Sequence, residues 1–180
     1  MSNINILLAG FGGQGILFMG KMTAYSGLMD GKEITWLPSY GPEMRGGTAN
    51  CSVCISDEPI GSPLVTHPDI LVAMNLPSLE KFENDVVAGG MIFVDSSMID
   101  KKVERDDVSV FYVPATKLAT DHNFEGLANM IMLGKVYKEA GFCTECAIDE
   151  ALRACVSARR IEMIETNKKA LKLGEDWIDA

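Results

Sequence analysis

A glycine-rich stretch near the start of the chain, Gly10-Phe11-Gly12-Gly13-Gln14-Gly15, constrains the fold more than any other feature. An apolar run, residues 4–9, precedes it, and a segment of helical composition, Ile16–Met29, follows it. A strand, a glycine turn and a helix begin a βαβ unit of the kind that binds dinucleotides, and the glycines have the spacing G-x-G-x-x-G. The helix N-terminus offers unpaired N–H groups and a positive dipole end to an anion. The stretch predicts either an anion-binding turn or a tight connection that binds nothing.

Strand-like and helical segments alternate along the rest of the chain. Strands are predicted at residues 3–9, 33–37, 48–56, 70–74, 91–94 and 108–113, with a hairpin between 48–56 and 59–60. Helices are predicted at residues 13–30, 77–84, 116–120, 126–140, 144–155 and 157–177. This order predicts a single α/β domain over residues 1–180, with a mostly parallel Rossmann-like sheet, an antiparallel hairpin addition and helices on both faces.

Composition excludes several classes of protein. Apolar residues make up 47% of the 180 residues, which is too many for a disordered chain. The net charge of −9 argues against nucleic acid as the main partner. No apolar run approaches the length of a membrane span, and residues 4–9 have no basic region before them. We therefore expect a cytoplasmic protein with no signal peptide and no membrane contact.

Four of the five cysteines form two C-x-x-C spacings, Cys51 with Cys54 and Cys143 with Cys146. Together they have the composition of a four-thiolate zinc or iron–sulfur site. However, a spacing of three within a strand places Cys51 and Cys54 on opposite faces, where they cannot easily hold one metal. The alternative is a set of small buried residues, and we predict no bound metal.

A second glycine-rich segment follows the second predicted strand: Pro38-Ser39-Tyr40-Gly41-Pro42-Glu43-Met44-Arg45-Gly46-Gly47. It is expected at the carboxyl edge of the sheet, where parallel α/β proteins bind ligands. Arg45 either binds an anion there or braces the loop by pairing with Glu43 or Asp95. Asp95, at the end of a predicted strand, either faces the ligand edge or caps the next turn. No acidic residue ends the second strand to hold a ribose, which argues against NAD or FAD.

The sequence has no self-sufficient catalytic set. It lacks the G-x-S-x-G nucleophile elbow and the G-x-x-x-x-G-K-[ST] phosphate loop, and its two histidines do not form a ligand pair. We therefore predict no catalytic and no metal-ligating residue. The predicted binding residues come from the two glycine-rich loops: Gly10, Gly12, Gly13, Gln14, Gly15, Tyr40, Gly41, Glu43, Arg45, Gly46 and Gly47.

Both loops, together with later motifs, carry a family resemblance. The first loop, the run from Pro38 to Cys51, the pairs Ser62-Pro63 and Pro68-Asp69, and Asn129 with Leu133-Gly134 resemble the gamma subunit of 2-oxoacid:ferredoxin oxidoreductases. This family includes the 2-oxoglutarate, ketoisovalerate and pyruvate enzymes. The resemblance covers nearly the whole chain. The PEMRGG form within the second loop is similar to members that act on 2-oxoglutarate or branched-chain 2-oxoacids.

The resemblance implies a gamma subunit that is inactive alone and works with alpha, beta and ferredoxin-like subunits. The complex would decarboxylate a 2-oxoacid, with 2-oxoglutarate favoured, consume coenzyme A, and yield an acyl-CoA, carbon dioxide and reduced ferredoxin. Thiamine diphosphate and the iron–sulfur clusters would lie on partner subunits, and coenzyme A would contact the loops of this chain. The isolated chain is expected either to self-associate, for example as a homodimer, or to expose an apolar patch. The alternatives are a stand-alone nucleotide-binding oxidoreductase and a non-catalytic interaction module.

Overall fold

The computed structural model describes residues 3–40, 48–156 and 161–178. Within them, six strands form one sheet in the order β2-β3-β1-β4-β5-β6. The strands are β1 (Asn3–Phe11), β2 (Glu33–Tyr40), β3 (Thr48–Ser56), β4 (Ile70–Ala73), β5 (Met91–Asp95) and β6 (Ser109–Val113). The helices are α1 (Ile16–Met29), α2 (Leu76–Phe82), the 3₁₀ turn η1 (Glu83–Asp85), α3 (Ala115–Asp121), α4 (Ala128–Ala140), α5 (Glu145–Cys155) and α6 (Met163–Glu175). The predicted single-domain α/β architecture is confirmed.

The sheet is mixed. β1, β4, β5 and β6 pair in parallel, whereas β3 pairs antiparallel with β1 on one side and with β2 on the other. β2 therefore runs in the same direction as β1. The carboxyl ends of all strands except β3 meet at one edge of the sheet, and the glycine turn after β1 lies at that edge.

The predicted hairpin between residues 48–56 and 59–60 is wrong. The nine residues of β3 pair with β1 and β2, and residues 59–60 form no strand. Seven of these residues, Ala49 and Cys51–Ser56, are buried, so β3 has the near-continuous burial of a central strand. β2 extends past Leu37 to Tyr40 and includes Pro38, because an edge strand tolerates a residue that lacks an N–H donor.

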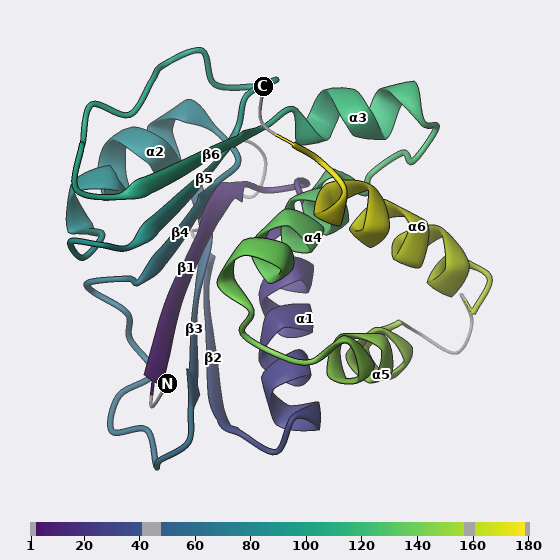
Figure 1. Cartoon of the computed structure of the whole chain (residues 1–180), viewed down its shortest axis with the longest axis horizontal. Helices are drawn as coiled ribbons and strands as arrows, with labels where there is room; N and C mark the ends of the chain where they lie inside the picture. The colour runs from purple at the N-terminus through teal and green to yellow at the C-terminus, as the bar shows by residue number, and fades with distance from the viewer. Residues whose placement is uncertain (1–2, 41–47, 157–160, 179–180) are drawn as a thin grey trace.

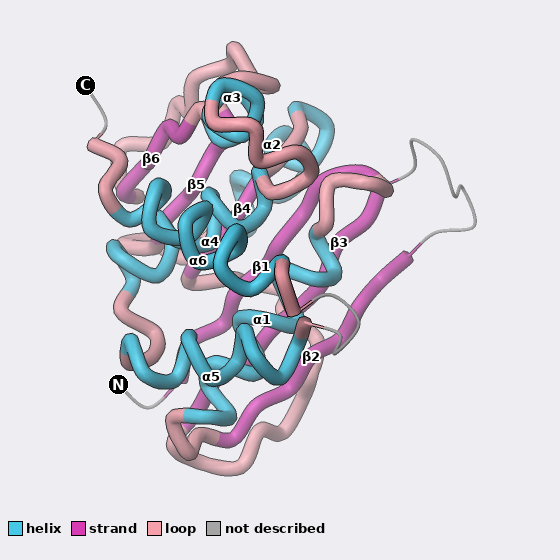
Figure 2. The backbone as a smooth tube through the Cα atoms, turned by 90° about the vertical axis from the view of Figure 1, so that its right-hand side faces the viewer, coloured by secondary structure: helices cyan, strands magenta, loops and turns pink. Residues whose placement is uncertain are grey.

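Helices cover both faces of the sheet, as expected, but very unevenly (Figure 1). One face packs against α1, α3, α4, α5 and α6, which contribute to the larger apolar core. Figure 2 shows α1, α4, α5 and α6 on the same side of the strands. The opposite face has a smaller core, in which strand residues pack against the short helix α2 and the connections around it. Cys51 belongs to the larger core and Cys54 to the smaller one, so their predicted placement on opposite faces is confirmed.

Helix α4 is buried over eight consecutive residues, 129–136, which confirms the predicted burial of this segment. It begins two residues later than the predicted residue 126, which has a positive φ of 74°. The last helix begins at Met163, residues 157–160 lie outside the described part of the chain, and Ile161 is exposed rather than part of the buried stripe.

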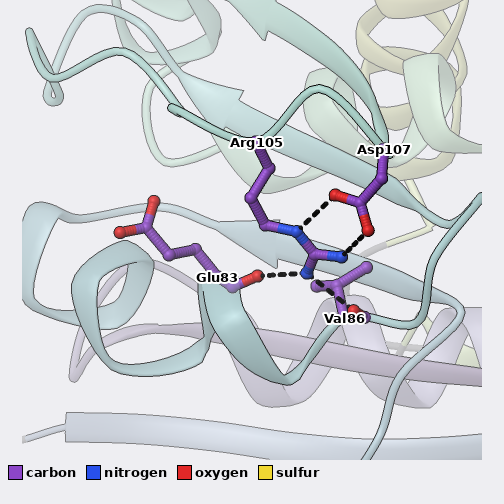
Figure 3. Close-up of polar contacts among 4 residues, drawn as sticks. All are labelled: Glu83, Val86, Arg105 and Asp107. Atoms are coloured by element: carbon purple, nitrogen blue, oxygen red, sulfur yellow. Dashed lines mark hydrogen bonds and ion pairs between the residues drawn. The ribbon is translucent and has the colours of Figure 1, made fainter.

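Arg105 holds the connection between β5 and β6 against the 3₁₀ turn η1 (Figure 3). Its guanidinium donates to the backbone oxygens of Glu83 at 2.9 Å and Val86 at 2.6 Å. It also donates to both carboxylate oxygens of Asp107, at 2.8 and 2.6 Å. One arginine therefore satisfies a carbonyl at the start of η1 and one just after it, and fixes a 13-residue connection, 96–108, that contains no helix. Among the described residues, no helix is long and apolar enough to cross a bilayer.

Candidate functional site

The glycine turn connects the carboxyl end of β1 to the first turn of α1. Gly13 and Gly15 have positive φ angles of 107° and 75°, a backbone conformation that residues with a side chain rarely adopt. Among the described residues, no atom lies within 4 Å of the position that a Cβ on Gly13 would take, so these residues leave the outer side of the turn open. No side chain in the described part of the chain caps the N-terminus of α1, whose first N–H groups have no partner within the helix. This geometry is suited to an anion or a polar ligand group at the turn.

Gln14 fixes the shape of the turn. Its side-chain oxygen accepts from the backbone N–H of Phe11 at 2.9 Å, and its amide nitrogen donates to the backbone oxygen of Met74 at 2.7 Å. The side chain therefore joins the end of β1 to the end of β4. Gly10 is required beneath it, because a Cβ there would lie 2.5 Å from the Gln14 side-chain oxygen. The structure thus gives Gln14 a positioning role within the predicted set.

Asn129, in the first turn of α4, packs directly against Gly15. Its Nδ2 donates to the Gly15 backbone oxygen at 3.1 Å, and the residue is only 3% exposed. Its Oδ1 is buried and accepts no hydrogen bond within the described part of the chain. Asn129 therefore holds the start of α4 against the start of α1. The resemblance named this residue, but its contact with Gly15 could not be inferred from a separation of 114 positions.

A pocket of about 430 Å³ opens beside the turn. Gly13 and Gln14 form one wall, Met74 lies at the end of β4, and α3 and the segment that leads into α4 form the other wall. Thr116, Thr120, Asn123 and Glu125 were missed by sequence reasoning. Their position after the last parallel strand is the signal that could have identified them, because the carboxyl ends of all parallel strands share this edge.

Asp95 has a structural role. It is fully buried, and its carboxylate accepts from Thr116 Oγ1 at 2.5 Å, from the Thr116 backbone N–H at 3.2 Å and from the Ser97 backbone N–H at 3.1 Å. Of the two roles left open for this residue, the capping of the turn is the one that these bonds support. Asp95 shapes the wall of the pocket through Thr116.

Residues 38–40 of the second predicted loop belong to β2, and residues 41–47 lie outside the described part of the chain, which excludes any geometric statement on Gly41, Glu43, Arg45, Gly46 and Gly47. The two residues that flank residues 41–47 are placed. Tyr40 pairs with Ala49, and Ala49 pairs with Gly10, while Thr48 pairs with Phe11. Both ends of this segment are therefore at the edge that carries the glycine turn, and a binding role for its residues stays a prediction.

The cysteines do not gather at this edge. Burial raises the pKa of Cys51 and of Cys143 to about 12, which keeps both thiols neutral at physiological pH. No group of three or more histidine, cysteine or acidic side chains in the described residues could hold a metal ion. The described side chains of the site thus provide shape and hydrogen bonds, and they include no activated nucleophile.

Comparison with known proteins identifies the family. The model of the pyruvate ferredoxin/flavodoxin oxidoreductase family matches residues 5–177. The chain belongs to this family, and its resemblance to the gamma subunits is confirmed.

Two curated relatives are similar over most of the chain. The ketoisovalerate oxidoreductase subunit VorA of Methanothermobacter marburgensis is 40% identical over 97% of this chain, but the match spans only 36% of that relative's length. The 2-oxoglutarate synthase subunit KorC of Methanocaldococcus jannaschii is 36% identical over 82% of this chain and 80% of the relative. Among solved structures, the gamma subunit of keto/oxoacid ferredoxin oxidoreductase from Geobacter sulfurreducens superposes with a TM-score of 0.85, 28% identity, and coverage of 98% of this chain and 96% of that one.

Proposed function

We propose that this chain is the gamma subunit of a multi-subunit 2-oxoacid:ferredoxin oxidoreductase, inactive alone. The complex decarboxylates a 2-oxoacid, transfers the acyl group to coenzyme A and passes the electrons to ferredoxin. One observation carries the proposal: a glycine turn lies beside a 430 Å³ pocket, and the described residues that line this pocket include no cysteine, histidine or lysine. Such a site binds and positions a ligand, while partner subunits supply the chemistry.

Coenzyme A is the ligand that we assign to this edge. The N–H groups at the start of α1 suit an anionic group, and Gly13 permits close approach to the backbone. Arg45, the cation among the predicted binding residues, is the counterpart that we propose for a phosphate of coenzyme A. Thiamine diphosphate and iron–sulfur clusters belong to the alpha, beta and ferredoxin-like partners in this proposal.

2-Oxoglutarate is the 2-oxoacid that we favour. The name of KorC supports it, and that relative matches this chain over most of its own length. Ketoisovalerate is the second candidate, because the relative named for it has the higher identity, 40%. The described pocket does not discriminate between them, since the 2-oxoacid would react at a cofactor on another subunit.

Reconstitution of the complex tests the function. The partner subunits are assayed with and without this chain, with coenzyme A and a viologen acceptor, using 2-oxoglutarate, ketoisovalerate and pyruvate in turn. We expect turnover that requires this chain and is fastest with 2-oxoglutarate. Turnover by this chain alone, or full coenzyme A-dependent activity without it, contradicts the proposal.

Arg45→Ala tests the assigned ligand within the assembled complex. A lost charge-assisted hydrogen bond of about 1.5–3 kcal/mol raises the KM for coenzyme A by about tenfold or more. Arg153→Ala, an exposed arginine on α5, is the matched control and should leave this KM unchanged. An unchanged KM for coenzyme A in a normally assembled Arg45→Ala complex removes Arg45 from the site.

A further inference from the structure

We infer that the pocket beside the glycine turn binds the neutral, amide-bearing arm of coenzyme A, while the phosphates and the adenine ring bind outside it. This inference rests on the proposed function. It assigns a defined part of the ligand to described residues that nothing else marks as a site.

The charge of the pocket excludes the phosphates. None of the described residues that line it is a lysine, arginine or histidine, and Glu125 adds an acidic side chain at its wall. Lys117, on the same helix as Thr116 and Thr120, forms an ion pair with Asp121 at 2.5 Å instead. Phosphate groups need cationic partners or the N–H groups of a helix start, and a carboxylate beside them would repel them.

The composition of the walls also argues against the adenine ring. A purine gains most from an aromatic or guanidinium surface on which it can stack, and the described lining residues include neither. The nearby aromatic pair, His122 with Phe124, stacks with itself at 6.0 Å between ring centroids and is not part of the wall.

A flexible amide chain fits the same walls. Met74, Ala119 and Ala128 supply an apolar surface for methylene and methyl groups. Thr120 and Asn123 supply a hydroxyl oxygen and a side-chain amide, which can pair with the N–H and C=O groups of the arm. The pocket is adjacent to Gly13, where the first N–H groups of α1 are available. A diphosphate at the helix start and an arm in the pocket are therefore neighbouring parts of one bound molecule.

Asn123 has a backbone conformation that makes it a suitable position for a test. It is the only described residue other than glycine with a positive φ, 56°. Asn123→Gly therefore removes the side-chain amide without strain in the backbone. Thr120, in contrast, is exposed on α3, so Thr120→Leu adds bulk to the pocket without disturbing the core.

The experiment compares coenzyme A with a fragment that lacks the arm. In the reconstituted complex, the KM for coenzyme A is measured together with the inhibition constant of adenosine 3′,5′-bisphosphate. We expect Thr120→Leu to raise the KM for coenzyme A by about tenfold, the effect of losing about 1.4 kcal/mol of binding, and to leave the inhibition constant unchanged. Asn123→Gly should act in the same direction with a smaller effect. Thr66→Leu, an exposed threonine on the other face of the sheet, is the matched control.

Two outcomes overturn the inference. An equal rise of both constants places the nucleotide in the pocket, and unchanged constants in both variants leave the pocket without a ligand. In either case the wild-type complex still turns over with coenzyme A, so the proposed function survives. A wild-type complex without coenzyme A-dependent turnover is the separate result that rejects the proposed function itself.

Discussion

Asn129 and Gly15 connect the start of α4 to the start of α1 at the edge where the parallel strands end. Asn129 Nδ2 donates to the Gly15 backbone oxygen, which also accepts the first hydrogen bond of α1 from the Met19 N–H at 2.9 Å. The contact is so close that a Cβ on Gly15 would overlap the Asn129 side-chain amide. The glycine at the sixth position of the motif is therefore required by protein packing, in addition to any ligand.

We expect Gly15→Ala to lower the free energy of unfolding by about 2 kcal/mol or more. A left-handed residue with a Cβ costs about 1–2 kcal/mol, and the overlap with Asn129 adds to this. Urea unfolding of the purified chain measures the change.

Gly31→Ala is the matched control for this substitution. Gly31 has the same φ of 75°, but no atom of the described residues lies within 4 Å of the position that its Cβ would take. Gly31→Ala should therefore lower the free energy of unfolding only by the cost of the left-handed backbone conformation. Equal losses in the two variants would mean that the Asn129 contact contributes nothing.

Gly134 and Gly174 allow close packing of α4 against α6. A Cβ on Gly134 would overlap the backbone oxygen of Leu171, and a Cβ on Gly174 would overlap that of Ile131. Because the obstacles are backbone atoms, Gly134→Ala requires the helices to move apart. We expect a loss of about 1–3 kcal/mol in the free energy of unfolding despite the better helix propensity of alanine. Gly61→Ala, in open space, should change it little, and a neutral Gly134→Ala would be evidence against this close helix contact.

Arg105→Lys should destabilise the chain by about 2 kcal/mol in urea unfolding. Lysine retains the charge but cannot reach two carbonyls and a carboxylate at once. Lys117→Ala removes an ion pair whose side chains are 68% and 49% exposed, and it should cost at most about 1 kcal/mol.

The pH dependence of the Arg105→Lys effect provides a second readout. The hydrogen bond from Arg105 lowers the pKa of Asp107. A carboxyl group whose pKa is lower in the folded state than in the unfolded state stabilises the folded protein near neutral pH. This contribution is lost as the pH falls and the carboxyl group becomes protonated. The difference between wild type and variant should therefore shrink below about pH 4. A difference between wild type and variant that stays constant below that pH as well would show that the carbonyl contacts alone carry it.

The sequence predicted those elements whose signal is local. The glycine turn, the apolar strand before it and the buried stretch of α4 follow from periodicity and from the conformational needs of glycine. Burial of Cys51 and Cys54 in separate cores follows from the alternation of side chains along a strand.

The pairing of strands in the sheet was not predictable in the same way. The residues of β3 fit either a hairpin with residues 59–60 or a central position between β1 and β2, because burial on both faces depends on strands that are distant in sequence. The same limit applies to the site. Nothing local marks Thr120 or Asn123 as neighbours of Gly13, since only the parallel order of the strands brings α3 to the glycine turn.

Cys146 is the thiol with which we expect an alkylating reagent to react first. It is the one exposed cysteine among the five, whereas Cys51 and Cys54 are buried. Its reactivity is restrained by Glu150, one turn further along α5, whose negative charge and hydrogen bond at 3.6 Å raise the pKa of the thiol. Because the thiolate is the reacting species, a raised pKa lowers the rate at pH 8.

Glu150→Gln removes that charge and so lowers the pKa of Cys146. We expect the alkylation rate at pH 8 to rise by a few-fold and the whole pH–rate curve to move to lower pH, with mass spectrometry locating the label on Cys146. Glu165→Gln, an exposed change on α6, should leave the curve in place and controls for net charge. A curve that does not move in Glu150→Gln would show that Glu150 does not set the reactivity of this thiol. Labelling of Cys51 before unfolding would contradict its burial, because a neutral thiol with a pKa of about 12 presents almost no thiolate at pH 8.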